Sequence, residues 1–216
     1  MKMNKKAKGI WNNKPFWCIL IFGLAVLCSS IKVLVLPQGG SLTYFGLLIL
    51  WLMTFIYGPR YGLIASVIFG FVRLGITYLT GEYINPNIWS IILEYPVAHG
   101  LFCLGGFLSE PKKETDLAIT ENESIQVEPY KLRMGYVIGV AAMLVCYVIS
   151  AELFYPTYRE GFWNNLIYNI IYDSSYLLIE GFFSVLLLCI PQVTQAIYYV
   201  KYVATHIDED DTLECF

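Results

Sequence analysis

The chain has 216 residues, of which 57% are hydrophobic, 16% aromatic and only 14% charged, and its mean hydropathy is +0.58. Soluble globular proteins carry about a quarter charged residues, so this composition excludes an ordinary soluble domain. The net charge of −3, without a basic patch, gives no reason to expect nucleic-acid binding.

Taken in chain order, the apolar runs predict an all-α membrane protein, a bundle of six transmembrane helices. Most runs are close to the roughly 20 residues that a helix needs to cross a hydrocarbon core. Turn-rich breaks at 37–41, 58–59 and 81–87 separate the first four runs. The predicted spans are 16–36, 42–57, 60–80, 88–108, 132–155 and 164–190.

The remaining segments complete one predicted membrane domain over residues 1–205. The connection 109–131 is rich in acidic residues and is expected to be a solvated cytoplasmic loop, and 206–216 an acidic disordered tail. Pro191 is expected to end or kink the last span and to leave a Tyr-rich segment near the membrane interface. The six cysteines are not paired at metal-ligand spacing, and neither a metal nor a cofactor is expected.

The distribution of Lys and Arg predicts the orientation, because these residues concentrate in cytoplasmic segments. With six spans, both termini lie on one side, which would hold eleven Lys and Arg residues against Lys32 and Arg159 on the other. We therefore predict cytoplasmic termini and outward-facing loops at 37–41, 81–87 and 156–163.

Ionisable side chains inside the spans are functional candidates, because a charge within a membrane is costly. At about 1.5 Å per helical residue, all but Glu180 fall in the outer half of the bundle. These residues are Arg73, Glu94, Glu152, Asp173 and Glu180. On the sixth span, polar residues recur at steps of three or four and predict one face turned into the protein: Asn165, Asn169, Asp173, Tyr176 and Glu180.

Two interpretations of these charges stay open at this point. An internal salt-bridge network, such as Arg73 with Glu94 or Asp173, would only hold the helices together. In the outer half, three carboxylates and one guanidinium leave about two negative charges unbalanced, and a buried unbalanced charge needs a partner. A cationic aromatic ligand would supply both the charge and a surface on which tyrosine rings could stack.

Two stretches are distinctive: Leu36 to Ser41 (LPQGGS), and Leu93 to Ala98 (LEYPVA) followed by Leu104 to Leu108 (LGGFL). The first resembles the loop after the first helix, and the second the fourth-helix signature, of the thiamine-binding S-components of energy-coupling factor (ECF) transporters, the ThiT family. The resemblance implies a multi-pass protein of the cell membrane that binds thiamine, or a close relative, from the extracellular side for uptake. It also implies that the chain is not an enzyme.

The resemblance assigns ligand contacts to Glu94, with Tyr95 beside it, and to two positions of the sixth helix. The full candidate set for substrate binding is Glu94, Tyr95, Tyr168, Asp173, Tyr83 and Glu152. The family carries a His four residues before a Gly on the fifth helix, where we align Val148 and Glu152, and an Asn where this chain has Asp173. These departures leave a different small cationic or aromatic ligand open. His99 does not replace the missing His by alignment and is expected to bond within the bundle.

The resemblance also implies partners: an ECF transmembrane coupling subunit and two ATPase subunits, in addition to the lipid bilayer. In agreement with that division of labour, the chain has no Gly-rich phosphate-binding loop ending in Lys-Ser or Lys-Thr. Two other classes stay open. One is a membrane enzyme that uses Glu94, Asp173 and His99 for acid–base chemistry, although no Ser/His/Asp grouping is visible. The other is a structural membrane protein without a ligand.

Overall fold

The computed structural model describes residues 14–109 and 128–205. The predicted tail at 206–216 and most of the predicted loop at 109–131 therefore lie outside the described residues. In chain order the elements are α2 (Lys14–Ser30), β1 (Lys32–Val35), β2 (Ser41–Thr43), α3 (Gly46–Tyr57), α4 (Pro59–Leu79), α5 (Ile88–Ile92), the π-helical turn η1 (Leu93–Val97), α6 (Ala98–Phe102), the 3-10 turn η2 (Cys103–Gly105), α7 (Gly106–Ser109), α8 (Pro129–Phe154), α9 (Phe162–Cys189) and α10 (Pro191–Thr205).

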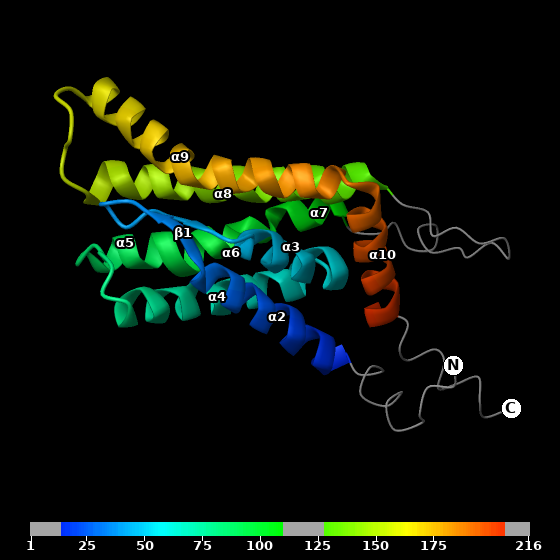
Figure 1. The fold of residues 1–216 in the computed structure, drawn as a ribbon. Coiled ribbons are helices and arrows are strands. Elements are labelled where there is room, and N and C mark those ends of the chain that lie inside the picture. The colour runs from blue at the N-terminus through cyan, green and yellow to red at the C-terminus, as the bar shows by residue number, and fades with distance from the viewer. Residues whose placement is uncertain (1–13, 110–127, 206–216) are drawn as a thin grey trace, which may run out of the picture.

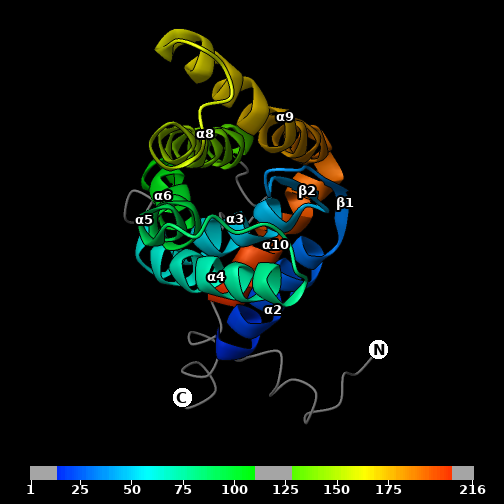
Figure 2. The same ribbon diagram turned by 90° about the vertical axis from the view of Figure 1, so that its left-hand side faces the viewer.

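The helices form an elongated bundle, and α10 lies across one end of it (Figure 1). The start of α2 and the start of α8 lie at the same end as α10, whereas the connections from α4 to α5 and from α8 to α9 lie at the opposite end. Seen along the bundle, α4, α6, α8 and α9 surround a central region, with the two strands on the side of α9 (Figure 2).

Four helical segments are long and apolar enough to cross a membrane: Pro59–Leu79, Ile88–Gly105, Pro129–Phe154 and Phe162–Cys189. Two shorter apolar helices, Pro15–Ser30 and Gly46–Tyr57, precede them. These lengths confirm the mostly helical, multi-pass membrane architecture. As predicted, the last span ends just before Pro191, which begins the separate helix α10 because a proline fits the first turn of a helix.

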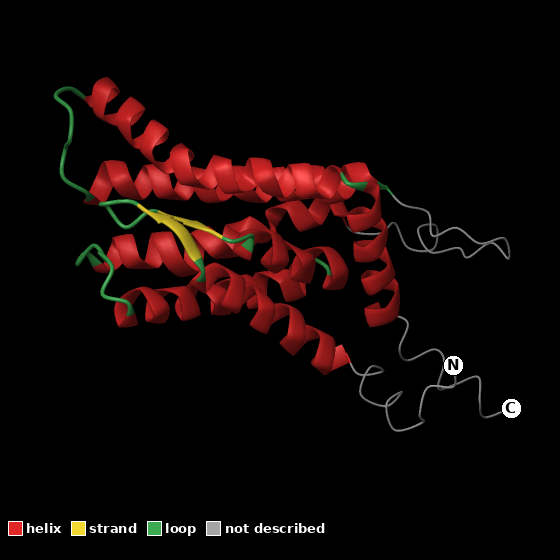
Figure 3. Cartoon of the chain, viewed as in Figure 1, coloured by secondary structure: helices red, strands yellow, loops and turns green. Residues whose placement is uncertain are grey.

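The predicted ends of the first two spans are wrong, because part of each forms an antiparallel hairpin instead of a helix (Figure 3). Val35 pairs with Ser41 and Lys32 with Thr43, although the spans 16–36 and 42–57 include most of these residues. The turn between the strands is closed by the Leu36 N–H, which donates to the Gly40 carbonyl at 2.7 Å. Gly39 takes a φ of +94°, a conformation open to glycine at little cost.

The surface of the bundle differs from that of a soluble protein, because many large apolar residues face outward, for example Leu79 at 83% exposure and Trp163 at 71%. The interior is mainly apolar and includes the buried Trp51 and Phe69. Polar residues of α9 also lie inside, and the predicted stripe on that helix is confirmed by the burial of Asn165, Asn169, Asp173 and Glu180. An apolar surface with polar side chains turned inward suits a lipid environment.

Close backbone contacts hold the helices around this interior. Gly70 of α4 lies against the Tyr95 carbonyl of η1, and a Cβ atom at this position would overlap it. Gly105 lies in the same way against Gly135 of α8. Small residues allow membrane helices to approach this closely, because little but van der Waals packing drives their association.

Candidate binding site

A single cavity receives side chains from nearly every element of the bundle. Its empty volume is about 980 Å³ when the open mouth is included. Its wall includes residues of α2, the hairpin, α4, η1, α6, α8 and α9, so the site exists only when the whole bundle is assembled.

The segment η1 places Glu94 and Tyr95 in the wall. Pro96 lies inside this helical segment and cannot donate a backbone hydrogen bond, and the chain takes a π-helical turn over Leu93–Val97. Single π-helical turns inside α-helices are frequent at functional sites. Here the wider turn changes the angle between the residues before Pro96 and those after it.

The Glu94 carboxylate is held by three hydroxyl groups. Ser90 and Ser150 donate to its Oε1 at 2.8 and 2.7 Å, and Tyr155 donates to its Oε2 at 3.2 Å. These contacts join η1 to α8 and fix the orientation of the carboxylate. They supply no positive charge, so Glu94 keeps its full electrostatic attraction for a cation in the cavity.

Two further carboxylates of the wall come from α9. Glu180 accepts hydrogen bonds from the Thr43 N–H and hydroxyl at 3.2 and 2.7 Å, and from the Leu47 N–H at 3.2 Å. Asp173 accepts one bond at its Oδ1, from the Tyr176 hydroxyl at 3.1 Å. Its Oδ2 is buried without a hydrogen-bond partner among the described residues. A buried polar atom left in this state is costly unless a ligand or water satisfies it.

Tyrosine rings form an aromatic part of the wall. Tyr147 of α8 and Tyr176 of α9 lie with ring centroids 6.3 Å apart, and Tyr172 packs edge-on to Tyr176 at 6.2 Å. All three rings line the cavity. Aromatic faces next to carboxylates favour a flat cation, because the ring faces and the acids both attract positive charge.

The hairpin covers part of the cavity. The Gln38 N–H donates to the Tyr172 hydroxyl at 3.0 Å, and the Gln38 amide donates to the Tyr168 hydroxyl at 2.9 Å. Gly40 lies so close to Tyr176 that a Cβ atom would come within 2.6 Å of its ring. Gly39 lies in the same way against the Tyr83 carbonyl. The Gly-Gly sequence therefore allows the backbone to seat directly on the tyrosines.

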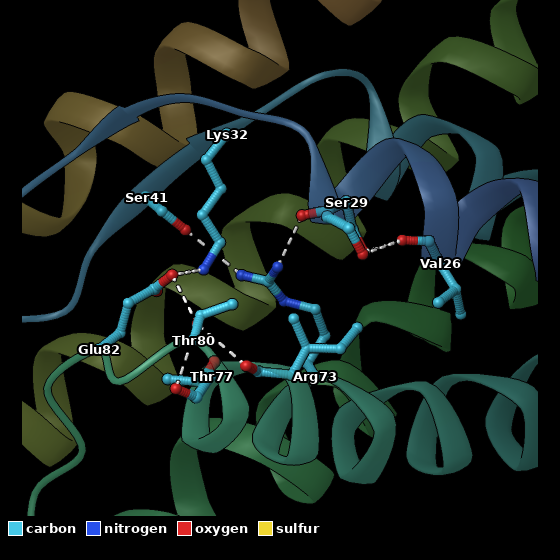
Figure 4. Close-up of polar contacts among 10 residues, drawn as sticks. Val26, Ser29, Lys32, Ser41, Arg73, Thr77, Thr80 and Glu82 are labelled. Carbon is cyan, nitrogen blue, oxygen red and sulfur yellow. Dashed lines mark hydrogen bonds and ion pairs between the residues drawn. The ribbon is translucent and has the colours of Figure 1, made fainter.

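Arg73 of α4 makes its hydrogen bonds with α2 and the hairpin (Figure 4). Its guanidinium donates to the Ser29 carbonyl at 2.7 Å and to the Ser41 hydroxyl at 3.3 Å, and it thus joins α2 and the hairpin to α4. Nearby, Lys32 forms an ion pair with Glu82, to which Thr80 also donates at 3.0 Å. Stapling of Glu94 or Asp173 by Arg73 is therefore not the arrangement found among the described residues.

Four of the six predicted site residues line the cavity: Tyr83, Glu94, Tyr95 and Asp173. Glu152 does not reach it and instead accepts hydrogen bonds from the side-chain amides of Asn165 and Asn169, both at 2.9 Å. Tyr168 lies one helical turn beyond Tyr172 and contacts the hairpin.

On the fifth predicted span, the residues that line the cavity lie one position before the pair that we aligned with the family motif. Tyr147 and Ala151, with the same four-residue spacing as Val148 and Glu152, are the pair that lines the cavity. Successive side chains on an α-helix point in directions about 100° apart. Ala151 therefore faces the cavity, whereas Glu152 faces α9. Nothing in the sequence identified Tyr147, whereas the polar period of the sixth span already placed Tyr176 on the inward face, although not among the candidate site residues.

The comparisons with known proteins agree with this architecture. The family model described as thiamine transporter protein matches residues 17–200. A solved structure of ThiT from Listeria monocytogenes superposes with a TM-score of 0.57 at 18% sequence identity, covering 82% of this chain and 94% of that one. A search of curated proteins gives no match. The solved structure shows the fold, and the family model, which spans most of the sequence, shows that this chain belongs to the thiamine transporter family, a family of transport proteins and not of enzymes.

Proposed function

We propose that this protein is the substrate-binding S-component of an ECF-type vitamin transporter and that it takes up thiamine, or a close cationic relative, from the extracellular side. Membership of the thiamine transporter family supports the substrate. The cavity supports the binding mode, because its wall combines carboxylates, tyrosine rings and residues of the hairpin. Thiamine has two aromatic rings, one of them the positively charged thiazolium, and carries hydrogen-bond donors, so it matches these features.

The single observation that carries this proposal is the state of Asp173. This residue is 6% exposed and lines the cavity, yet its Oδ2 has no partner among the described residues. A purely structural carboxylate at such a depth would be expected to have its hydrogen bonds satisfied by the protein. A ligand with a positive charge or a donor group would complete the set.

In the proposed complex, one group of residues contacts the charge of the ligand and another contacts its aromatic rings. Glu94 and Asp173 supply negative charge from η1 and α9, and Tyr147, Tyr172 and Tyr176 supply ring faces. Tyr83 and Tyr95 complete the wall near the hairpin. We propose that the other two candidates act indirectly: Tyr168 by holding Gln38 of the hairpin, and Glu152 by fixing the Asn165 and Asn169 side chains.

We propose further that the protein spans the cell membrane six times with cytoplasmic termini. The ends of α2 and α10 that lead to the termini lie at one end of the bundle, and the hairpin opens toward the other (Figure 1). Transport would then require a transmembrane coupling subunit and two ATPase subunits. The Lys and Arg asymmetry of the sequence supports this orientation.

Calorimetry on the detergent-solubilised full chain tests the substrate. Thiamine should bind without ATP, and thiochrome, an oxidised form without the positive charge, should bind at least about tenfold more weakly, because it forgoes charge-assisted contacts. Thiamine phosphates and the pyrimidine precursor extend the series. An absence of heat with every one of these compounds would contradict a thiamine-related ligand.

Cysteine labelling in a variant that lacks the native cysteines tests the orientation. A membrane-impermeant maleimide added to intact cells should modify Cys introduced at Asn87 or Glu160, but not at Glu121. Modification at Glu121 from the outside would invert the proposed topology, with both termini then outside the cell.

A further inference from the structure

His99 of α6 lies in the wall of the cavity and has no part in the contacts described above. The side chain is 4% exposed and packs at a tilt against Phe69 of α4, with ring centroids 5.4 Å apart. A histidine held this firmly on the cavity wall presents a fixed pattern of hydrogen-bonding groups to whatever occupies the cavity.

The hydrogen bond of one ring nitrogen fixes the role of the other. Nδ1 lies 2.8 Å from the Tyr95 carbonyl oxygen, which can only accept, so Nδ1 carries the hydrogen. No carboxylate contacts the ring among the described residues, and a buried imidazole without such a partner stays neutral. In a neutral imidazole with hydrogen on Nδ1, Nε2 is an acceptor.

The π-helical turn explains how His99 and Glu94 come to share one cavity. On a regular α-helix, two residues five positions apart point in directions about 140° apart. The π-helical turn over Leu93–Val97 follows an i→i+5 pattern instead, which brings such residues toward the same face. The π-helical turn that contains Pro96 therefore sets the direction of the His99 side chain as well as that of Glu94.

We propose that Nε2 of His99 accepts a hydrogen bond from a neutral N–H or O–H donor of the bound cation, and that this contact selects among related ligands. The proposal rests on the proposed function, since it concerns the same cavity. The carboxylates Glu94 and Asp173 attract the charge of the ligand, whereas His99 accepts a hydrogen bond from a donor group that carries no charge. Thiamine offers two such donors, the exocyclic amine of the pyrimidine and the hydroxyl of the side chain.

Two substitutions separate the two ring nitrogens. In His99→Asn, the amide nitrogen occupies nearly the position of Nδ1 and can still donate to the Tyr95 carbonyl, but nothing replaces Nε2. In His99→Gln, the longer amide reaches the position of Nε2 and can offer an acceptor there. We expect the Asn variant to bind thiamine about tenfold more weakly, since a buried donor of the ligand loses its acceptor, and the Gln variant to keep most of the affinity.

Ligand analogues then identify the donor. Calorimetry with thiamine, oxythiamine (no exocyclic amine) and deoxythiamine (no side-chain hydroxyl) is run on the wild type and on both variants. One analogue lacks the donor that bonds to His99. The wild type should have a lower affinity for this analogue than for thiamine. The Asn variant should have the same affinity for it as the wild type, because the lost hydrogen bond no longer counts. The melting temperature of each empty protein serves as the control for folding.

Three results would overturn the inference. The first is equal thiamine affinity of the wild type and the Asn variant. The second is a loss of affinity in the Asn variant that is the same for thiamine and for both analogues. The third is a lower melting temperature of the empty Asn variant with weak binding that Gln does not restore, which would make His99 structural. Failure of the wild type to bind thiamine would overturn the proposed function as well, so the two failures are distinguishable.

Discussion

Asp173 and Glu180 lie two turns apart on the same face of α9 and are buried to nearly the same extent, at 6% and 5% exposure. Both line the cavity. Glu180 receives three hydrogen bonds from Thr43 and Leu47, and its carboxylate lies at the start of α3, where backbone N–H groups favour a negative charge. Asp173 receives one bond, from a tyrosine hydroxyl of its own helix.

The difference separates two uses of a buried acid. The Glu180 carboxylate is satisfied by the protein itself and joins α9 to the hairpin and α3. Asp173 is left with an oxygen that only a ligand or water can satisfy. Burial alone, which is the same for both residues, therefore does not indicate function. The identity and number of donors around the carboxylate do.

The largest expected effect concerns Glu180. Glu180→Ala should lower the free energy of unfolding of the empty protein by at least about 3 kcal/mol, because three buried donors lose their acceptor at roughly 1–3 kcal/mol each. Thermal or denaturant unfolding in detergent measures the change. An empty protein as stable as the wild type would mean that Glu180 is not the structural acid of the pair.

Asp173→Asn is the complementary substitution and should leave the stability of the empty protein unchanged or raise it. Thiamine binding should weaken by about 1.5–3 kcal/mol, the usual range for a hydrogen bond to a charged group. Calorimetry measures the affinity for thiamine, and melting with and without ligand measures the stability of the empty and the bound protein. A large loss of empty-state stability that Arg73→Met repairs would show instead that Asp173 is held by Arg73.

Glu82 offers a third kind of acid, one neutralised by a lysine. Lys32→Met leaves its carboxylate without the ion pair that ties the hairpin to the segment after α4. We expect thiamine to dissociate faster, by a factor that corresponds to at most about 1.5–3 kcal/mol, the usual contribution of a hydrogen bond to a charged group. Stopped-flow displacement measures the rate. The double variant Lys32→Met with Glu82→Met serves as the control and should recover part of the loss, whereas an unchanged rate in the single variant would contradict a role for this pair.

The smallest effect is expected at Glu152, which the sequence placed in the binding site. Its contacts are the amides of Asn165 and Asn169 and not the cavity. Glu152→Gln should change the affinity for thiamine by less than about 0.5 kcal/mol, as is usual for a substitution away from a site. A loss as large as that of Asp173→Asn would restore the original prediction of a direct contact.

The sequence identified the main features of the molecule because membrane burial leaves a strong chemical pattern. Long apolar runs indicated the helices, and the rare charges within them indicated Glu94 and Asp173. The polar period of the last span indicated which face of α9 is inside. The hairpin was missed because β1 is short and mostly apolar and continues the run of the first span, while β2 has only three residues, so hydropathy does not distinguish either strand from helix.

Other features were decided only by the tertiary structure. Hydropathy and spacing cannot tell which donors reach a given carboxylate. In the sequence, Glu180 therefore differed from Asp173 and Glu152 only by its depth, and the latter two looked alike. Their different roles follow from Thr43, Leu47 and two asparagines that lie far away along the chain or on a neighbouring helix. The helical phase of His99 also depended on the π-helical turn at Pro96. The sequence by itself determined which residues must be kept from lipid, and the packing of the helices determined which of them meet, because a contact depends on the position of both partners.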